Sequence, residues 1–549
     1  MSFAKYIVAL GCAALLGACS ATVSSDDDED ASSESSSSSK RKSSSSTSDK
    51  KSSSSNSSDK KSSAEEKDSV NSSSSKEDGK SSSSTEELDE DCIGESGKPW
   101  DGTTAKTFAC GAGTKLSPYI ILTAEQLAKL AFIVGANETE YEGKYYKLGA
   151  DIILNKGKII DDKGALVADS SKLHKWTPIG NSSVGFTGTF DGNGHTISGM
   201  FINTTSSHNG LFGNNQGSIS HLILENSWVS GGKFSAGIAG INGGSITKAT
   251  NYSSIIGNED CTGGVAGQSN GPYPKKSMIS SSTNHGIIKG KNYTGGIAGQ
   301  AYQASIENAE NHGLVEGGSN VGGIAGRGAY TYVSSYFMDC KNALNYANII
   351  GENNVGGIIG GAGYVSPTIS SGSILATVTN VKNEGQVLGK KYIGGIIGFA
   401  NRVSVNNAGN TASIEGSDYI SGIVGNLLGS NSSFLYNTGK ISGSTYVGGI
   451  IGYNQEGVTS SAYSTGKVDG DSLVGLMIGY NYNTTMADYY YLEQGDQEPF
   501  GLNNSGGVAT PKSSKEMKTS DFAELLGEDF VYDSGLNDGY PILKWEMEE

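Results

Sequence analysis

The sequence predicts an all-β fold, a parallel β-solenoid (β-helix) of about ten coils, from three features. A short glycine phrase such as Gly448-Gly449-Ile450-Ile451-Gly452 recurs, an asparagine column runs in step with it, and short β-type runs lie between them. Repeats that share a fixed minimum period, here 27 residues, are typical of solenoids. The phrase closes at Gly213, Gly240, Gly267, Gly299, Gly326, Gly360, Gly398, Gly425, Gly452 and Gly479.

The asparagine column stands fifteen residues before the closing glycines, in phrases such as Asn383-Glu384-Gly385. Asparagine tolerates the left-handed region and bonds its own backbone, and glycine takes positive φ, so these phrases predict turns. Residues 447–451 and 458–463 are strand-like in composition. One unit of three strands and three turns cannot bury an apolar face alone, so the coils must stack, with right-handed winding preferred. The column comprises Asn284, Asn311, Asn345, Asn383, Asn410, Asn437 and then Ser464.

The third position of the glycine phrase is aliphatic in nearly every repeat, and strand parity places residues such as Val447 on the same side. We expect both sets to stack inside the solenoid. The third-position column is Ile238, Val265, Ile297, Ile324, Ile358, Ile396, Ile423, Ile450 and Met477.

Residues 1–18 have the pattern of a signal peptide, with Lys5 before an apolar core at residues 6–16. The phrase Leu16-Gly17-Ala18-Cys19 resembles a bacterial lipobox, which implies lipidation of Cys19 and anchoring in a membrane. An ordinary secretory signal is the alternative. Ser20, with no Asp after it, resembles the outer-membrane sorting pattern, so we expect an exported protein at the outer membrane or cell surface.

Residues 19–91 are rich in serine and mixed charges, and residues 92–175 begin the folded part. The serine-rich stretch cannot bury enough apolar area to fold, so it predicts a disordered linker; polyelectrolyte contact with the envelope is the alternative. In an exported protein Cys92 and Cys110 predict a disulfide, whereas the pairing of Cys261 and Cys340 stays open.

We expect a small α/β cap at residues 92–175, the solenoid at 176–492 and a short helical cap at 493–549. The N-terminal cap should contain a helix that starts at Thr123, because Thr123 and Gln126 form a capping-box pattern. Strands are expected at residues 145–148 and 151–154. A helix at residues 521–527, ending at Gly527, should cap the last coil, because open solenoid ends expose strand edges.

The repeat resembles the GLUG-motif repeat of bacterial surface proteins over roughly residues 115–545. The resemblance rests on Gly-Gly-Ile-Ala-Gly at residues 295–299 and 322–326, on the opening phrase at 176–180 and on the closing phrase at 537–543. It implies the solenoid architecture and a surface location, and it carries no catalytic residue. Some relatives are attached to immunoglobulin-cleaving metalloproteases, but the His-Glu-x-x-His zinc phrase is absent from this sequence.

The formal net charge is −17, and no basic stripe is present, so nucleic acid is not an expected partner. No CxxC spacing suggests zinc, and we expect no cofactor. The phrase at residues 267–271 has the spelling of a nucleophile elbow but lacks its strand-then-helix context. The acidic residues of the repeats are scattered, so we expect no catalytic activity.

Three coils are lengthened between the closing glycine and the next asparagine, at residues 268–283, 327–344 and 361–382. A shared insertion point places these loops at one corner, which is often the binding face of a repeat protein. Aromatic rings with nearby donors suit sugar rings or a protein partner; packing of the loops onto the solenoid is the alternative. The candidate residues are Tyr273, Lys275, Lys276, Arg327, Tyr330, Tyr332, Tyr336, Phe337 and Tyr364.

A second aromatic column, Tyr392, Tyr419 and Tyr446, should point outward, either to bind glycan or to stack between strands. Together these features predict a lipid-anchored, non-catalytic surface binding or adhesion module for a glycan, a fibre-like polymer or a surface protein. A structural envelope component is the first alternative, and a carbohydrate-active β-helix enzyme, a lyase or glycosidase, is the second.

Overall fold

The computed structural model describes residues 92–329, 337–363 and 373–547. They belong to the second of two compact units, Thr85–Glu549. The predicted signal peptide, the lipidation site Cys19 and the serine-rich linker lie outside the described residues. None of the helices in the described ranges has the length and hydropathy needed to span a bilayer.

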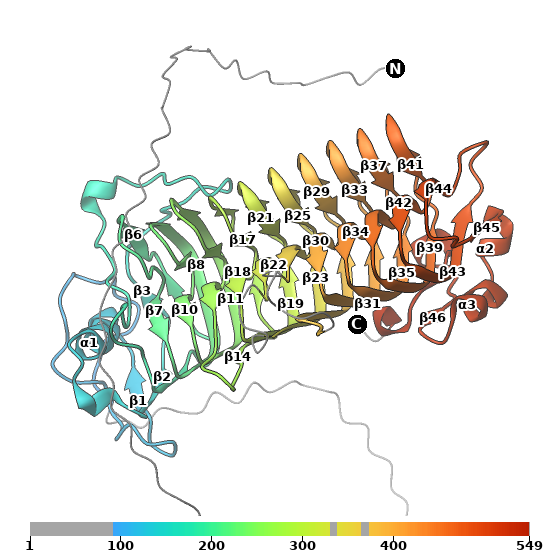
Figure 1. Cartoon of the computed structure of the whole chain (residues 1–549). Helices are drawn as coiled ribbons and strands as arrows, with labels where there is room; N and C mark the ends of the chain where they lie inside the picture. Colours follow the sequence, from blue (N-terminus) through green and yellow to red (C-terminus); the bar gives the residue numbers. More distant parts are fainter. Residues whose placement is uncertain (1–91, 330–336, 364–372, 548–549) are drawn as a thin grey trace, which may run out of the picture. The chain divides into compact units, whose positions relative to one another are not determined.

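The described residues form the predicted parallel β-solenoid, in which successive coils stack along one axis (Figure 1). The central coils contribute strands to three sheets of 25, 11 and 9 strands. One coil runs through β35 (Asn431–Asn437) and β36 (Ile441–Ser442) in the largest sheet, β37 (Thr445–Gly448) in the 9-stranded sheet and β38 (Ile451–Gln455) in the 11-stranded sheet. Neighbouring coils pair in parallel, with Val447 opposite Ile420 and Val474.

The interior contains the expected aliphatic columns. Every residue of the third-position column, from Ile238 to Met477, is fully buried, as are Val321, Val355 and Val447. These side chains belong to one continuous apolar core that runs through the stack. Both columns therefore face the interior, as strand parity predicted.

The asparagine column also lies inside, which differs from the expected left-handed turns. Each buried amide donates from Nδ2 to Oδ1 of the next asparagine at 2.8 Å, from Asn251 to Asn437. Each Nδ2 also donates to the carbonyl two residues later in its own coil, as Asn383 does to Gly385 at 2.9 Å. The expected bond to the local backbone is therefore present, but positive φ belongs to a different column, Asn308, Asn342, Asn380 and Asn407.

The glycine phrase forms a corner instead of the continuous strand expected at residues 447–451. β37 ends at Gly448 and β38 begins at Ile451. A Cβ on Gly422, at the equivalent corner one coil earlier, would lie 2.3 Å from the amide carbon of Asn437 and 2.3 Å from the carbonyl oxygen of Gly449. Glycine is required here because the corner backbone lies directly against the buried asparagine column.

The N-terminal region continues the solenoid and adds one helix. α1 (Ala124–Gly135) begins after Thr123, whose capping box with Gln126 is present. β2 (Tyr145–Leu148) pairs with β4 (Thr189–Asp191), and β3 (Ile152–Ile153) pairs with β5 (Thr196–Ser198). β1 (Tyr119–Ile121) pairs with β2, and a disulfide joins Cys92 to Cys110.

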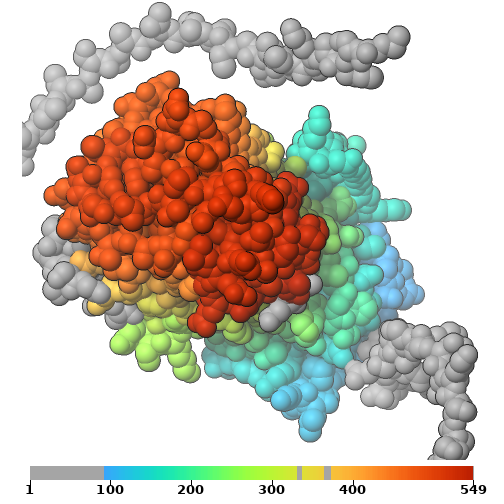
Figure 2. Space-filling view, turned by 90° about the vertical axis from the view of Figure 1, so that its right-hand side faces the viewer, coloured from blue at the N-terminus to red at the C-terminus, as the bar shows by residue number. Residues whose placement is uncertain are grey.

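The C-terminal segment contains the expected helix, α3 (Ser520–Leu526), together with α2 (Ser514–Met517), β46 (Phe530–Val531) and β47 (Ile542–Leu543). The sequence suggested that this segment caps the last coil, and in the structure it contacts the side of the last coils. Its apolar residues pack on Tyr436, Tyr463 and Tyr490, which project from the flank of the largest sheet. Figure 2 shows these red residues beside the orange residues of the last coils. The last strands of the two larger sheets are β44 (Phe500–Asn503), which pairs with β42 (Ile478–Tyr482), and β45 (Ala509–Lys512), which pairs with β43 (Thr485–Leu492).

Candidate functional site

The three insertions leave the solenoid at one corner, as the sequence predicts. Each follows a strand of the 11-stranded sheet and precedes a strand of the largest sheet. The strand pairs are β13 (Ala266–Ser269) and β14 (Ser277–Ser280), β22 (Ala325–Gly328) and β23 (Met338–Asn345), and β26 (Ile359–Ala362) and β27 (Ala376–Asn383).

Two of the three candidate cations at this corner, Lys276 and Arg327, contact other residues of the solenoid. Lys276 forms an ion pair with Asp339, and its ammonium lies 4.5 Å from the centre of the Phe337 ring. The Arg327 guanidinium lies 4.9 Å from the centre of the Tyr293 ring. These contacts favour packing at the base of the insertions.

Few of the described candidate residues in the insertions are exposed to solvent. Tyr273 is 65% exposed, and Lys275 is also exposed. Tyr330, Tyr332, Tyr336 and Tyr364 lie outside the described residues. The described part of this corner therefore presents one accessible ring, Tyr273.

A groove that the sequence did not indicate lies on the outer face of the largest sheet. Its volume is about 580 Å³. One wall is formed by residues 157–164, which we call the strap. The other side is formed by β8 (Ser218–Gly231), β11 (Ser245–Gly257) and the turn after Asn284.

The strap is held to the sheet by hydrogen bonds and close packing. The Asn226 amide donates to the Gly157 carbonyl at 2.7 Å and accepts from the backbone N–H of Ile159 at 2.9 Å. A Cβ on Gly164, where φ is +73°, would lie 2.8 Å from Ser254 Oγ. Asp161 stabilises the strap turn, because its Oδ1 accepts from the backbone N–H groups of residues 163 and 165.

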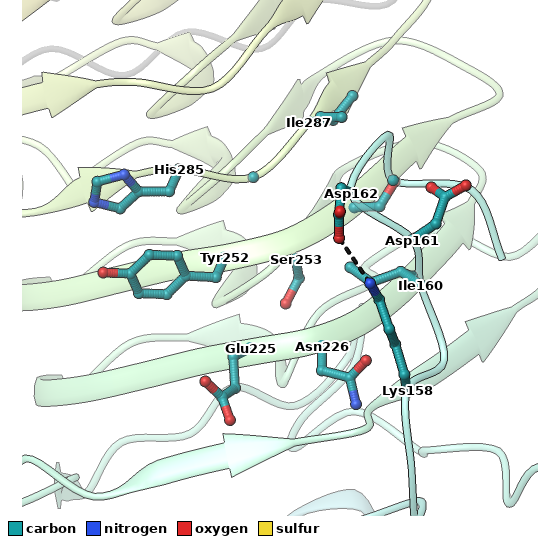
Figure 3. Close-up of a pocket in the computed structure, with 13 residues that line it drawn as sticks. Lys158, Ile160, Asp161, Asp162, Glu225, Asn226, Tyr252, Ser253, His285 and Ile287 are labelled. Carbon is teal, nitrogen blue, oxygen red and sulfur yellow. Dashed lines mark hydrogen bonds and ion pairs between the residues drawn. The ribbon is translucent and has the colours of Figure 1, made fainter. Parts of the chain in front are cut away.

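The groove combines aromatic rings with polar side chains. Figure 3 shows the rings of Tyr252 and His285 on one side and the strap on the other, with Ser253 and Asn226 between them. On the strap, Lys158 Nζ lies 2.7 Å from Asp162 Oδ1. The polar groups that line the groove are Lys158, Asp161, Asp162, Glu225, Asn226, Ser253 and Ser254.

The two rings of the groove begin a four-ring stack, Tyr252, His285, His312 and Tyr346, which we call the ring ladder. The ring centres are 4.5, 4.7 and 4.6 Å apart, and the rings are within 17° of parallel. Each ring directly follows an asparagine of the buried column, so it points outward where the asparagine points inward. The sequence contains the signal for this ladder, because an aromatic or imidazole ring follows each of these four asparagines.

The imidazoles of the ring ladder have distinct surroundings. Burial lowers the pKa of His285, and the neighbouring His312 lowers it further. His312 Nε2 lies 2.8 Å from Glu310 Oε2. His285 is therefore disposed to stay neutral and to offer one donor and one acceptor at its ring edge.

A covering segment lies at each end of the ring ladder on the outer face of the largest sheet. The strap lies at the Tyr252 end. Beyond Tyr346 the ladder position is Glu384, and Lys382 bridges Glu384 and Glu546 of the C-terminal segment at 2.8 and 3.0 Å. The ring ladder therefore occupies the stretch of the face between two covering segments.

The tyrosine column predicted from the sequence is also present. Tyr392, Tyr419 and Tyr446 are half-buried and stacked, with ring centres 4.8 and 4.5 Å apart. Because stacked rings cover one another's faces, this column favours cross-strand stacking over a flat platform. Over the described ranges no group of three or more His, Cys, Asp or Glu side chains is arranged to hold a metal ion.

Comparison with known proteins gives partial similarities, and no protein-family model matches the chain. A stretch of 129 residues is 33% identical to a candidate Gly-rich membrane protein of Evansella cellulosilytica, over 23% of this chain and 13% of that protein. A stretch of 138 residues is 33% identical to Halomucin of Haloquadratum walsbyi, over 24% of this chain and 1% of that protein. The chain thus spans only a small part of either relative.

Among solved structures, a candidate immunoglobulin A1 protease from Bacteroides ovatus aligns over 80% of this chain and 95% of that chain, with 16% identity and a TM-score of 0.35. A similarity at this level supports no argument about activity. The name of the first sequence relative agrees with a location at a membrane or cell surface, and no specific function follows from these comparisons.

Proposed function

We propose that this chain is a non-catalytic binding module of the bacterial cell surface, and that its ligand is an extended polysaccharide. The observation that carries the proposal is the groove beside the strap, which continues directly into the ring ladder. A volume of about 580 Å³ lies within the range of small-ligand sites, which is roughly 300–1,000 Å³.

The chemistry of the groove suits a sugar better than an apolar ligand. A pyranose has hydroxyl groups around its rim and apolar C–H groups on its faces. The groove offers carboxylate, amide, hydroxyl and ammonium groups beside the rings of Tyr252 and His285. Such a mixture lets the polar groups fix orientation while the rings contribute apolar area.

The ring ladder suits a repeating ligand. Its rings cover one another's faces, so it presents a row of ring edges, with tyrosine hydroxyls at the ends and imidazole nitrogens between them. This row repeats once per coil, at 4.5–4.7 Å, over four coils. A chain of sugars that leaves the groove along the solenoid axis meets a hydrogen-bonding ring edge at each step.

The location at the cell surface is supported by the lipobox at Cys19, the serine-rich linker, the resemblance to GLUG-motif surface proteins and the named membrane relative. In this arrangement a lipid anchor holds the chain to the membrane, and the linker lets the solenoid stand away from it. The anchor and the family resemblance are parts of the proposal.

A glycosidase function has less support in this groove. Glycoside hydrolysis uses two carboxylates that flank the scissile bond. Of the three acidic residues in the groove, Asp161 holds the strap turn and Asp162 pairs with Lys158. Glu225 is then left as the one groove carboxylate without such a structural task in the described contacts.

The proposal is tested by retention of the full chain on a panel of insoluble polysaccharides, with Tyr252→Ala as the site variant. Tyr252 is 47% exposed, so its loss leaves the core intact. We expect Tyr252→Ala to weaken retention about tenfold, as for the loss of a central ring contact. Tyr273→Ala is the matched control, because it removes an exposed ring at the insertion corner.

Two results would contradict the proposal. Loss of binding in Tyr273→Ala but not in Tyr252→Ala would place the site at the insertion corner. Failure of the parent chain to bind any polysaccharide would favour a structural envelope role, in which the ring ladder serves only to stabilise the solenoid. Circular dichroism of each variant checks that the fold is retained.

A further inference from the structure

The groove beside the strap carries an excess of negative charge. Its lining contains three carboxylates, Asp161, Asp162 and Glu225, against one ammonium, Lys158. That ammonium is already paired, because Lys158 Nζ lies 2.7 Å from Asp162 Oδ1. Burial lowers the pKa of His285, so its ring adds no compensating positive charge near neutral pH. The groove therefore presents more carboxylates than the cations of its own lining neutralise.

Glu225 is an exposed carboxylate that lies next to the ring ladder. Its backbone pairs directly with that of Tyr252 in the parallel register of β8 and β11. Adjacent strands lie about 4.8 Å apart, so Glu225 occupies the ladder position one coil before Tyr252. Both side chains are exposed, and Figure 3 shows them on the same side of the groove, across from the strap. A ligand that contacts the Tyr252 ring therefore has the Glu225 carboxylate beside it.

A glutamate also follows the last ring of the ladder, and there it has a cation. Glu384 occupies this position, and its carboxylate lies 2.8 Å from Lys382 Nζ. At Glu225 the Ser227 hydroxyl donates to the backbone carbonyl at 2.7 Å, and among the described residues no cation or hydrogen-bond donor contacts the carboxylate. The ring ladder is thus flanked by two glutamates, of which only Glu384 finds its cation within the described chain.

The unpaired charge of Glu225 determines which ligand fits. A polymer that covers Glu225 removes water from an ionised carboxylate, and this costs free energy unless the ligand supplies a compensating charge. An ammonium group supplies both a positive charge and hydrogen-bond donors, and its bonds to a carboxylate are stronger than those of a neutral hydroxyl. An acidic sugar would instead bring a like charge to the three carboxylates of the groove.

We propose that the groove selects a polysaccharide with free amino groups, of the glucosamine type, whose ammonium pairs with Glu225 while the sugar contacts Tyr252. This inference rests on the proposed function of the groove and narrows its ligand from polysaccharides in general to cationic amino sugars. The formal net charge of −17 attracts a polycation to the chain as a whole. Glu225 makes that attraction specific to the groove.

The test measures binding of two matched oligosaccharides to the full chain by isothermal titration calorimetry. The probes are β-1,4-linked tetramers of glucosamine and of N-acetylglucosamine, which differ only in acetylation of the amine, and a tetramer of galacturonate is the anionic probe. A pH of about 6 keeps both carboxylates and amines charged. Glu225→Gln removes the charge and keeps the shape. Glu415→Gln is the matched control, because it removes an exposed carboxylate at the end of β32 (Ile414–Glu415) in the same sheet.

We expect the glucosamine tetramer to bind about tenfold more tightly than the acetylated tetramer, and Glu225→Gln to weaken its binding about fivefold or more. Glu415→Gln should bind as the parent does. Glu225→Lys should reverse the preference, so that the galacturonate tetramer binds more tightly than the glucosamine tetramer. A residue with only a structural role would not reverse the choice of ligand.

Three results would overturn the inference. Equal affinity of the parent for the two matched tetramers would show that the amine is not recognised. Equal losses in Glu225→Gln and Glu415→Gln would show a general attraction to the acidic chain. Displacement of the glucosamine tetramer by an equal concentration of tetralysine would favour a cationic peptide as the ligand.

The proposed function and this inference fail separately. If the two matched tetramers bind equally and Tyr252→Ala weakens both, polysaccharide binding in the groove stands and selection of the amine falls. If the parent chain binds neither the oligosaccharides nor any insoluble polysaccharide, both fall.

Discussion

Replacing Asn383 by alanine should destabilise the solenoid strongly, because Asn383 is a central member of the buried amide column. Its Nδ2 donates to Asn410 at 2.8 Å and to the carbonyl of Gly385 at 2.9 Å. Its Oδ1 accepts from Asn345 at 2.8 Å. The side chain is fully buried, so water cannot replace these partners in the folded state.

The magnitude follows from the three lost bonds. A net contribution of about 1 kcal/mol per bond gives about 3 kcal/mol, and the buried Oδ1 of Asn410, left without its donor, adds up to about 2 kcal/mol. We therefore expect Asn383→Ala to lower the free energy of unfolding by about 3–5 kcal/mol. The amides of Asn345 and Asn410 lose one partner each, so the effect should extend to both neighbouring coils.

Asn380, in the same strand, provides the matched control. It makes equivalent amide bonds to Asn342 and Asn407, at 3.0 and 3.1 Å, on the outside of the solenoid. Its φ is +55°, so glycine is the substitution that removes the bonds without backbone strain. We expect Asn380→Gly to cost less than about 1 kcal/mol, because water replaces the exposed bonds.

The assay is urea unfolding of the full chain followed by circular dichroism, with hydrogen exchange of the neighbouring strands as a local readout. Local exchange is needed because long repeat arrays can unfold in parts. If Asn383→Ala destabilises no more than Asn380→Gly, burial of the amide column does not stabilise this fold and the reasoning is wrong.

Three further predictions concern the corner, the C-terminal segment and the ring ladder. Gly395→Ala should lower the free energy of unfolding in urea by about 4 kcal/mol or more, because the added Cβ would lie 2.0 Å from the Gly422 carbonyl oxygen. Gly135→Ala is the control and should leave stability unchanged, because no atom lies within 4 Å of its added Cβ. Lys382→Met should weaken docking of the C-terminal segment on the solenoid by about 2–3 kcal/mol, because the Glu546 carboxylate, 5% exposed, loses its cation. Unchanged protease resistance of residues 513–547 would contradict this. The pKa of His285 is lowered in the folded state, so the unfolded chain binds the proton first and the free energy of unfolding should fall as pH drops below about 6.5. His285→Phe should lose less stability between about pH 8 and about pH 5.5, and equal losses would refute the assignment.

The features that the sequence predicted correctly share one physical property, which is that they repeat with the coil. Ile450 and its equivalents had to stack inside because each is separated from the next by whole coils. The capping box at Thr123 was likewise local, since the bonds of a helix N-terminus involve residues three positions apart. The insertion corner followed from the same register, because loops at one point of the repeat leave the stack at one corner.

The asparagine column shows where a local interpretation of a repeated residue is incomplete. Asparagine before glycine is typical of turns, and the bond to the local backbone is indeed present. Whether the side chain also points inward depends on the three-sheet cross-section, which brings the glycine corner against it. The Asn column packs against the Gly column inside the solenoid. The sequence alone does not indicate which residues face each other across a coil.

The sequence by itself determined the coil period, the buried aliphatic columns, the N-terminal helix and the positions of the insertions. Tertiary structure alone decided that the strap lies beside Tyr252, roughly 90 residues later in the chain, and that the C-terminal segment docks on Tyr436 and Tyr463. The physical reason is periodicity. Contacts between coils recur at a fixed sequence separation, whereas a segment outside the repeat binds wherever its own side chains find complementary partners, and no period in the sequence records that choice.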